Sequence, residues 1–349
     1  MTTAVPNSML AFDGGSAFRN KIINGCGWID QRNNNSAVTV SSTANTFGPD
    51  RWAGFGQATD GAFTLVGTKG FWDSAGKGMP SSIYAQTTTP DSAIGTTQAY
   101  GIRYCIEGQD IAPWRVGTAQ AALATLSFRA YSTKAGTHCV SLQNSAGTRS
   151  YVATYSIPVA GAWTQVVIPI QMDATGTWLT DNGIGIRLVW NMGSGANFLT
   201  ATPNTWVAGQ FYSIFAAQNV IDTASAILAI TDVQFELGGG PSTFELRSIG
   251  QELEMCQRYY ETGRQPYFYA NFAAGLNAGY GDVRFAAAKR AAPSAVAATG
   301  WQYFSGGSGT AFTPTISTLL VDGFQFQATS LTNWNGWGGN GTWAANAEL

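Results

Sequence analysis

The chain has 349 residues, of which 45% are apolar, only 11% are charged and 42 are glycine. The 18 lysines and arginines are balanced by 20 carboxylates, so no basic field exists that would favour nucleic acid as a partner. With so few charges, surface polarity must come from Ser, Thr, Asn and Gln, which is typical of β-rich proteins that work outside cells. We therefore expect an all-β protein that binds no nucleic acid.

The sequence shows no sign of a membrane span or of a secretion signal. No apolar run is long enough to cross a bilayer, and residues 1–20 lack the basic and apolar regions of a signal peptide. We expect no membrane insertion. If the protein works outside a cell, it leaves by another route, such as lysis.

The cysteines are far apart in the chain and form no CxxC pair; they are Cys26, Cys105, Cys139 and Cys256. Neither a zinc site nor a redox motif is indicated, so we expect no metal and no cofactor. Free buried thiols are the favoured interpretation, with disulfides as the alternative.

Between residues 36 and 237, short apolar or alternating runs recur between clusters of Gly, Ser, Thr, Asn and Pro. This pattern predicts a many-stranded antiparallel sandwich. In 126–130 and 184–190 every second residue is apolar, so each is predicted to be a half-buried strand whose arginine, Arg129 or Arg187, points away from the core.

One further strand-like stretch, 163–170, contains Pro169. Because proline lacks a backbone donor for the ladder, Pro169 favours an edge strand or a strand end. Large rings in such contexts fill sandwich cores, so Trp52, Trp163 and Trp190 are expected to be structural.

One segment has helical periodicity, with apolar side chains at spacings of four, three and four, namely Ile249, Leu253, Cys256 and Tyr260. Ser248 and Gln251 form a capping-box signature at its start, and Gly263 is a plausible C-terminal stop. The seam between two domains is placed at this helix. The stretch after it is rich in aromatic residues and glycine, and 324–326 reads as a strand.

Several stretches resemble a carbohydrate-binding, galactose-binding-like jelly roll of tail-fibre and minor structural proteins of tailed bacteriophages. They are residues 20–25, 29–32 and 50–52 at its start, 193–195, 204–206 and 230–237 near its end, 244–250 and 256–261 at the linking helix, and 289–293 and 347–349 beyond it. Two positions depart from the family pattern. Cys26 replaces a frequent acidic residue, which argues against a calcium site there, and Ser248 replaces proline but remains a good cap.

The resemblance implies four parts: an N-terminal attachment segment (1–19), a carbohydrate-binding-like jelly-roll sandwich (20–245), a short linking helix (246–263) and a smaller C-terminal β-sandwich domain that forms the receptor-binding tip (264–349). It also implies a homotrimer, which the Ile249, Leu253, Cys256 and Tyr260 stripe fits as an interface. The N-terminal side would join other virion proteins. Such a protein is made in the cytoplasm of the host bacterium and carried on the virion surface.

Candidate catalytic groups are few. The single histidine, His138, alternates with apolar residues and is expected to be structural. No GxSxG motif occurs, and acidic pairs such as Asp173 with Asp181 could form a glycosidase dyad only if the fold brought them together. We therefore expect no catalytic residues and no enzyme activity.

A glycan site is predicted near the C-terminus, where residues 333–343 place rings among glycines and asparagines. Sugars need flat aromatic area together with fixed polar groups. The candidates are Trp334, Trp337 and Trp343, with Asn335, Asn340 and Tyr303 as polar partners. The alternative, that these tryptophans only fill the end of the domain or a subunit interface, is equally open.

The leading hypothesis is a fibre or spike protein that attaches a phage to its host by binding cell-surface polysaccharide. One rival is a polysaccharide depolymerase. Another is a head fibre or decoration protein with no receptor role.

Overall fold

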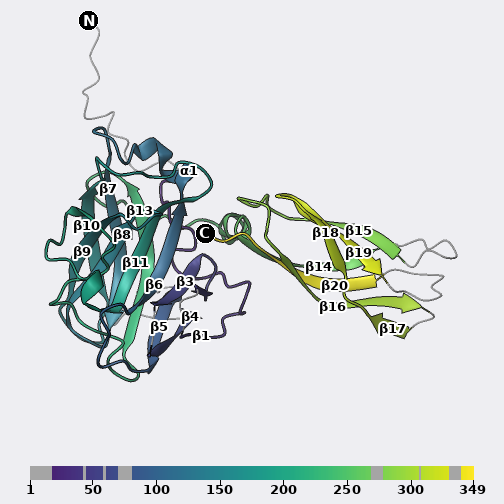
Figure 1. The fold of residues 1–349 in the computed structure, drawn as a ribbon, viewed down its shortest axis with the longest axis horizontal. Coiled ribbons are helices and arrows are strands. Elements are labelled where there is room, and N and C mark those ends of the chain that lie inside the picture. The colour runs from purple at the N-terminus through teal and green to yellow at the C-terminus, as the bar shows by residue number, and fades with distance from the viewer. Residues whose placement is uncertain are drawn as a thin grey trace, which may run out of the picture. The chain divides into compact units, whose positions relative to one another are not determined.

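The computed structural model describes residues 18–41, 45–57, 60–69, 81–268, 278–305, 308–329 and 339–349. The chain divides into two compact units, residues 1–247 and 248–349. Both are built mainly of antiparallel strands (Figure 1), which confirms the all-β prediction of a jelly-roll sandwich followed by a smaller β unit. The predicted attachment segment, apart from Phe18 and Arg19, lies outside the described residues.

The first unit is a sandwich of two sheets. The six-stranded sheet has the order β1 (Val38–Val40), β4 (Ala62–Lys69), β5 (Ser81–Thr89), β13 (Ile227–Leu237), β7 (Leu123–Ser132) and β10 (Thr164–Gln171). The seven-stranded sheet has the order β12 (Trp206–Ala208), β9 (Arg149–Ile157), β8 (Gly136–Gln143), β11 (Ile184–Ser194), β6 (Ala99–Glu107), β3 (Trp52–Gln57) and β2 (Thr46–Phe47). Three short helices, α1 (Gly108–Ile111), η2 (Ala112–Trp114) and η3 (Ala196–Phe198), lie in the connections.

Large rings fill the space between these sheets. Trp52 and Trp190 are fully buried with ring centroids 5.4 Å apart, and Phe128 meets Trp190 edge-on at 5.6 Å. The structural role predicted for both tryptophans is confirmed. Trp163, in contrast, is only half-buried and lies just before β10, so the expectation that its ring enters the core is wrong.

The predicted strands are present, as β7, β10, β11 and β19 (Gly323–Thr329). Because their side chains alternate between a core face and an outer face, Arg129 and Arg187 remain partly exposed as expected. The edge position that Pro169 favoured is also confirmed, since β10 is the last strand of the six-stranded sheet.

The second unit begins with α2 (Ile249–Gln257) and continues as two smaller sheets. One has the order β14 (Tyr260–Phe268), β20 (Gly339–Asn346), β16 (Val296–Ser305) and β17 (Ser308–Ala311), and the other β15 (Ala278–Arg284), β19 (Gly323–Thr329) and β18 (Thr315–Leu319). Their core contains Trp301, Phe324, Phe326 and Trp343.

The capping of α2 is as predicted at its start but not at its end. The Ser248 side chain accepts a hydrogen bond from the Gln251 backbone N–H, as an N-cap residue should. The helix stops at Gln257, and Gly263 lies inside β14. Tyr260 is likewise a strand residue, so the predicted stripe is not continuous on one helix.

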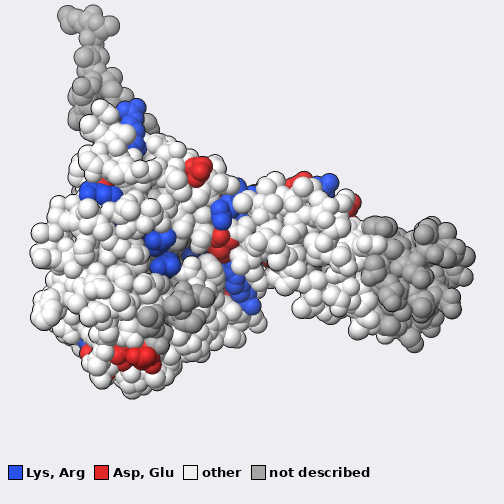
Figure 2. All heavy atoms as spheres, in the orientation of Figure 1, with Lys and Arg blue, Asp and Glu red and all other residues white. Residues whose placement is uncertain are grey.

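The remaining predictions about the chain's chemistry concern buried groups. All four cysteines are free and buried, as favoured by their spacing. Among the described residues no group of three or more His, Cys, Asp and Glu side chains could hold a metal, and no helix is long and apolar enough to cross a membrane. On the visible face, Figure 2 shows that uncharged residues predominate.

Candidate functional site

A row of aromatic side chains crosses the outer face of the six-stranded sheet. Ala229 on β13 is paired with Tyr84 on β5 and with Tyr131 on β7, so these side chains lie side by side on one face. Trp163 continues the row beyond Tyr131, with ring centroids 5.5 Å apart and an interplanar angle of 49°. We call Tyr84, Tyr131 and Trp163 the aromatic row.

The strand pattern explains why these rings point outward. Ile83 and Ala85 on either side of Tyr84 belong to the core, so Tyr84 must face the other way. Ala130 before Tyr131 is likewise a core residue. With neighbouring strands about 4.8 Å apart, a row over four strands extends about 14 Å.

The three rings of the row are half-buried, so each presents part of its surface to solvent. Burial raises the pKa of Tyr84, and the nearby Tyr131 raises it further, so the Tyr84 hydroxyl stays protonated at neutral pH. A protonated phenol both donates and accepts hydrogen bonds. Ala229, between the two tyrosines, is fully buried.

Polar side chains flank the row on both sides. Gln86 lies two residues from Tyr84 on β5, and its amide is 3.5 Å from the Ser225 carbonyl. On the other side, Arg129 and Gln165 are paired across β7 and β10. The Arg129 guanidinium is 3.6 Å from Asp232, which holds it beside the rings.

This arrangement combines the two features that a sugar requires. Ring faces can cover the apolar C–H surface of a pyranose, while amide, hydroxyl and guanidinium groups at the margins can bind its hydroxyls. Because Tyr84 and Tyr131 are carried by strands, and Trp163 packs beside Tyr131 just before β10, the spacing of the rings is fixed before a ligand arrives. The row therefore suits an extended ligand that lies flat on the sheet.

The predicted C-terminal site is only partly described. Trp334, Asn335 and Trp337 lie outside the described residues, and Tyr303 is on β16 with its side chain outside the description. Asn340 is half-buried on β20, where it is paired with Gln302.

The structure corrects the sugar-binding role predicted for Trp343. Its side chain is only 5% exposed and packs against Phe285 and Phe324, with ring centroids 5.5 and 5.6 Å apart. Gly263 lies directly opposite on β14, and its missing side chain makes room for the indole ring. Trp343 is thus a packing group whose ring offers no platform for a sugar.

The residues of the predicted interface stripe differ in their exposure and do not all lie on α2. Ile249 is 59% exposed and Leu253 is half-buried, so both have surface available for a partner. Cys256 is fully buried in the chain itself and cannot contribute a surface knob. Tyr260 begins β14 rather than continuing α2.

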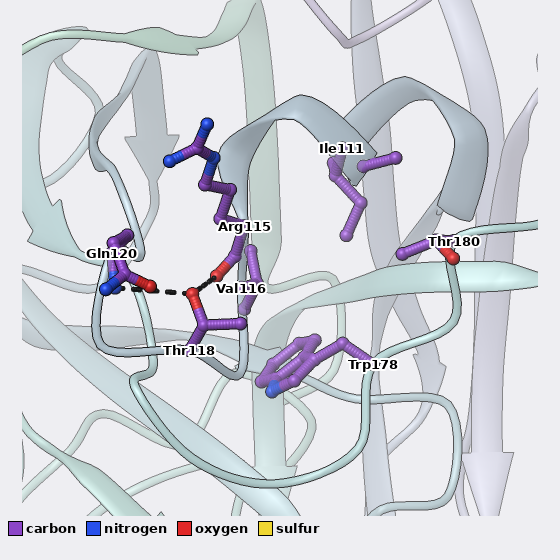
Figure 3. A pocket seen from close by; sticks show the side chains of 8 residues that line it. Ile111, Arg115, Val116, Thr118, Gln120, Trp178 and Thr180 are labelled. Carbon is purple, nitrogen blue, oxygen red and sulfur yellow. Dashed lines mark hydrogen bonds between the residues drawn. The ribbon is translucent and has the colours of Figure 1, made fainter.

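A pocket of about 400 Å³ lies between the α1–η2 segment and residues 178–180 of the first unit (Figure 3). Ile111, Val116 and the edge of Trp178 supply apolar surface. Trp178 is only 8% exposed, and the Thr118 hydroxyl donates a hydrogen bond to the Arg115 carbonyl. In Figure 3 the Arg115 guanidinium points away from Trp178, so the pocket lacks an open ring face with polar groups beside it.

The candidate catalytic residues have structural partners. His138 is buried, donates from Nε2 to the Lys134 carbonyl at 2.9 Å and stacks on Tyr155, which confirms its structural role. Asp173 accepts two hydrogen bonds from Arg149, at 2.6 and 2.9 Å, and Asp181 caps the turn at Gly183.

No protein-family model matches the chain, and no curated protein sequence matches it. Among solved structures, it is similar to the enzymatically active domain of tailspike protein 4 of bacteriophage CBA120. The identity is 12% over 64% of this chain and 22% of the tailspike chain, with a TM-score of 0.32.

Two further similar structures come from Clostridium thermocellum. The CBM22-1–GH10 modules of xylanase 10B are 12% identical over 60% of this chain and 30% of theirs, with a TM-score of 0.29. The family 11 carbohydrate-binding module is 13% identical over 58% of this chain and 95% of its own, with a TM-score of 0.28. The match spans less than a third of the tailspike and xylanase chains.

Proposed function

We propose that this protein binds glycans through the aromatic row of its first unit, and that it does so as a receptor-binding fibre or spike protein on the surface of a tailed phage. The observation that carries the proposal is the row itself. Tyr84 and Tyr131 both pair with Ala229 of the strand between them, and Trp163 packs beside Tyr131. The three rings are partly exposed and flanked by amide and guanidinium groups. The sequence resemblance of residues 20–262 to phage tail-fibre proteins supports the proposed place on a phage surface.

A single site of this kind binds weakly. Water competes for every sugar hydroxyl, so each hydrogen bond contributes only about 1 kcal/mol net. An affinity in the millimolar to micromolar range follows, and useful adhesion would come from linked copies, whose avidity exceeds that of one site by roughly a hundredfold or more. The homotrimer that the family resemblance implies would link three such sites.

The test of glycan binding uses Tyr131→Ala, which removes the central ring of the row. We expect glycan affinity to fall about tenfold, since an aromatic contact contributes roughly 0.5–1.5 kcal/mol beyond its buried area. Binding is measured on a glycan array and then by calorimetry with the best ligand. Phe215→Ala is the matched control, because Phe215 is an exposed ring (93%) outside the row. Equal binding by both variants and the parent would contradict the proposal.

The trimer is tested separately. Ile249 and Leu253 of the predicted stripe have exposed surface, so Ile249→Asp is expected to yield monomers if they form the contact. Light scattering at micromolar concentration gives the mass. A monomeric parent protein would contradict the trimer, and an unchanged trimer in the variant would contradict the role of α2.

The proposal includes no catalysis, and the depolymerase alternative predicts a different outcome. Host polysaccharide incubated with the purified protein should show no new reducing ends. Turnover that disappears on Asp173→Asn, while folding is retained, would establish an enzyme instead.

A further inference from the structure

Two arginines share the outer face of the seven-stranded sheet, away from the aromatic row. Arg103 on β6 is paired with Val189 on β11, and Arg187 on β11 is paired with Cys105 on β6. The two side chains are therefore diagonal neighbours on one face. The residues that alternate with them belong to the core, so this face is the outer one. We call Arg103 and Arg187 the arginine pair.

The segment that connects β12 to β13 packs against the sheet beside the arginine pair. Ser141 and Gln143 on β8 both donate to the Phe211 carbonyl, at 2.6 and 3.0 Å, which fixes this segment against the sheet. The next residue, Tyr212, is 1% exposed and is hydrogen-bonded to Arg103. The Arg103 guanidinium also lies over the Phe55 ring, 4.1 Å from its centroid.

The charge of the arginine pair is not neutralised within the described part of the chain. No described carboxylate forms an ion pair with either residue. Their side-chain partners are neutral: Arg103 donates to Asn45 at 2.7 Å, and Arg187 donates to the Ser145 carbonyl at 3.3 Å. Figure 2 shows small groups of basic side chains on a mostly uncharged surface.

Three buried polar atoms at this place lack a partner among the described residues. They are Nε of Arg103, Nε of Arg187 and the side-chain oxygen of Gln143, which is paired with Arg187 in the sheet. Burial lowers the pKa of Arg103, and the charge of Arg187 lowers it further, while Cys105 and Tyr212, the other titratable groups facing it, act in the opposite direction. Such an arrangement is costly unless an anion completes it.

We propose that the arginine pair is a second glycan site, on the sheet opposite the aromatic row, and that it binds the carboxylate of an acidic sugar. The inference rests on the proposed function for the ligand being a glycan. Guanidinium groups match a carboxylate through parallel N–H donors, and a buried setting strengthens such hydrogen bonds. Both arginines are partly exposed, so a ligand can reach them.

The test compares glucuronate with its methyl ester, which has the same ring without the charge. Binding to the full chain is followed by NMR through the side-chain Nε–H signals of the arginines. We expect glucuronate, but not the ester, to shift the signals of Arg103 and Arg187, and Arg187→Gln to weaken binding roughly tenfold or more. Arg187→Lys should recover only part of the lost affinity, because an ammonium lacks the parallel N–H donors of a guanidinium group. Arg115→Gln, at an exposed arginine elsewhere in the unit, should bind as the parent does.

The outcomes separate this inference from the proposed function. Equal binding of glucuronate and its ester, or no shift of either arginine signal by glucuronate, would overturn the anionic site. Inorganic phosphate that binds as tightly as glucuronate would show a general anion site and would also overturn recognition of an acidic sugar. Tyr131→Ala tests the aromatic row on the other sheet and should leave glucuronate binding at the arginine pair unchanged. Failure of the aromatic row as a glycan site is therefore distinguished from failure of the anionic site.

Discussion

The two units of this protein fill their cores in different ways. In the first, two wide sheets enclose rings that interlock between them, as Trp52, Trp190 and Phe128 do. In the second, rings lie over glycines of neighbouring strands, with Gly263 opposite Trp343 and Gly281 opposite Phe326. A narrow sandwich has less depth for a large side chain, so a glycine on the adjacent strand supplies the missing space. The comparison shows that glycine-rich sequence can be a packing device rather than a sign of loops.

The largest expected effect concerns a buried ion pair in the second unit. The Lys289 ammonium is 2.5 Å from a Glu261 carboxylate oxygen, and both side chains are almost fully buried. Glu261→Gln leaves a buried cation without its counter-ion, so the free energy of unfolding should fall by about 3–5 kcal/mol. Urea denaturation measures the change. The double variant Glu261→Leu, Lys289→Met should lose much less, and an equal loss would contradict this reading of the pair.

A smaller effect is expected from filling the space beneath a ring. A Cβ added at Gly263 would lie 2.3 Å from the Trp343 ring, so Gly263→Ala should cost about 1–3 kcal/mol. Gly240 has nothing within 4 Å of the same position and serves as the control. Thermal unfolding of the two variants measures the difference in their stability. If they were equally stable, the glycine would not be needed for packing.

The smallest effect is a pH dependence confined to the first unit. Burial lowers the pKa of His138 in the folded protein. The unfolded chain therefore takes up a proton at higher pH than the folded one, and stability decreases as the pH falls through about 6.5, the ordinary value for histidine. His138→Gln should reduce this decrease when urea midpoints at pH 7.5 and 5.5 are compared. An unchanged decrease would assign the pH dependence to other groups.

The sequence predicts the strands and their faces well because alternation is a local property. It places Tyr131 on the same face as Arg129, two residues away, so one ring of the aromatic row could have been found. It cannot show that Tyr84 lies next to Tyr131, because that depends on the pairing of both strands with Ala229, far along the chain. The role of Trp343 was missed for the same reason, since its glycine partner lies on another strand.

The margins of the first unit's sheets have a consequence for crowded copies of the chain. Three of the four outermost strands are very short: β1 and β12 have three residues each and β2 has two. The fourth, β10, carries Pro169, which has no backbone N–H to offer. An exposed strand recruits strands from other molecules only when it presents an unbroken line of free backbone donors and acceptors. Neighbouring copies of the chain therefore have few free backbone groups along these margins through which their sheets could join.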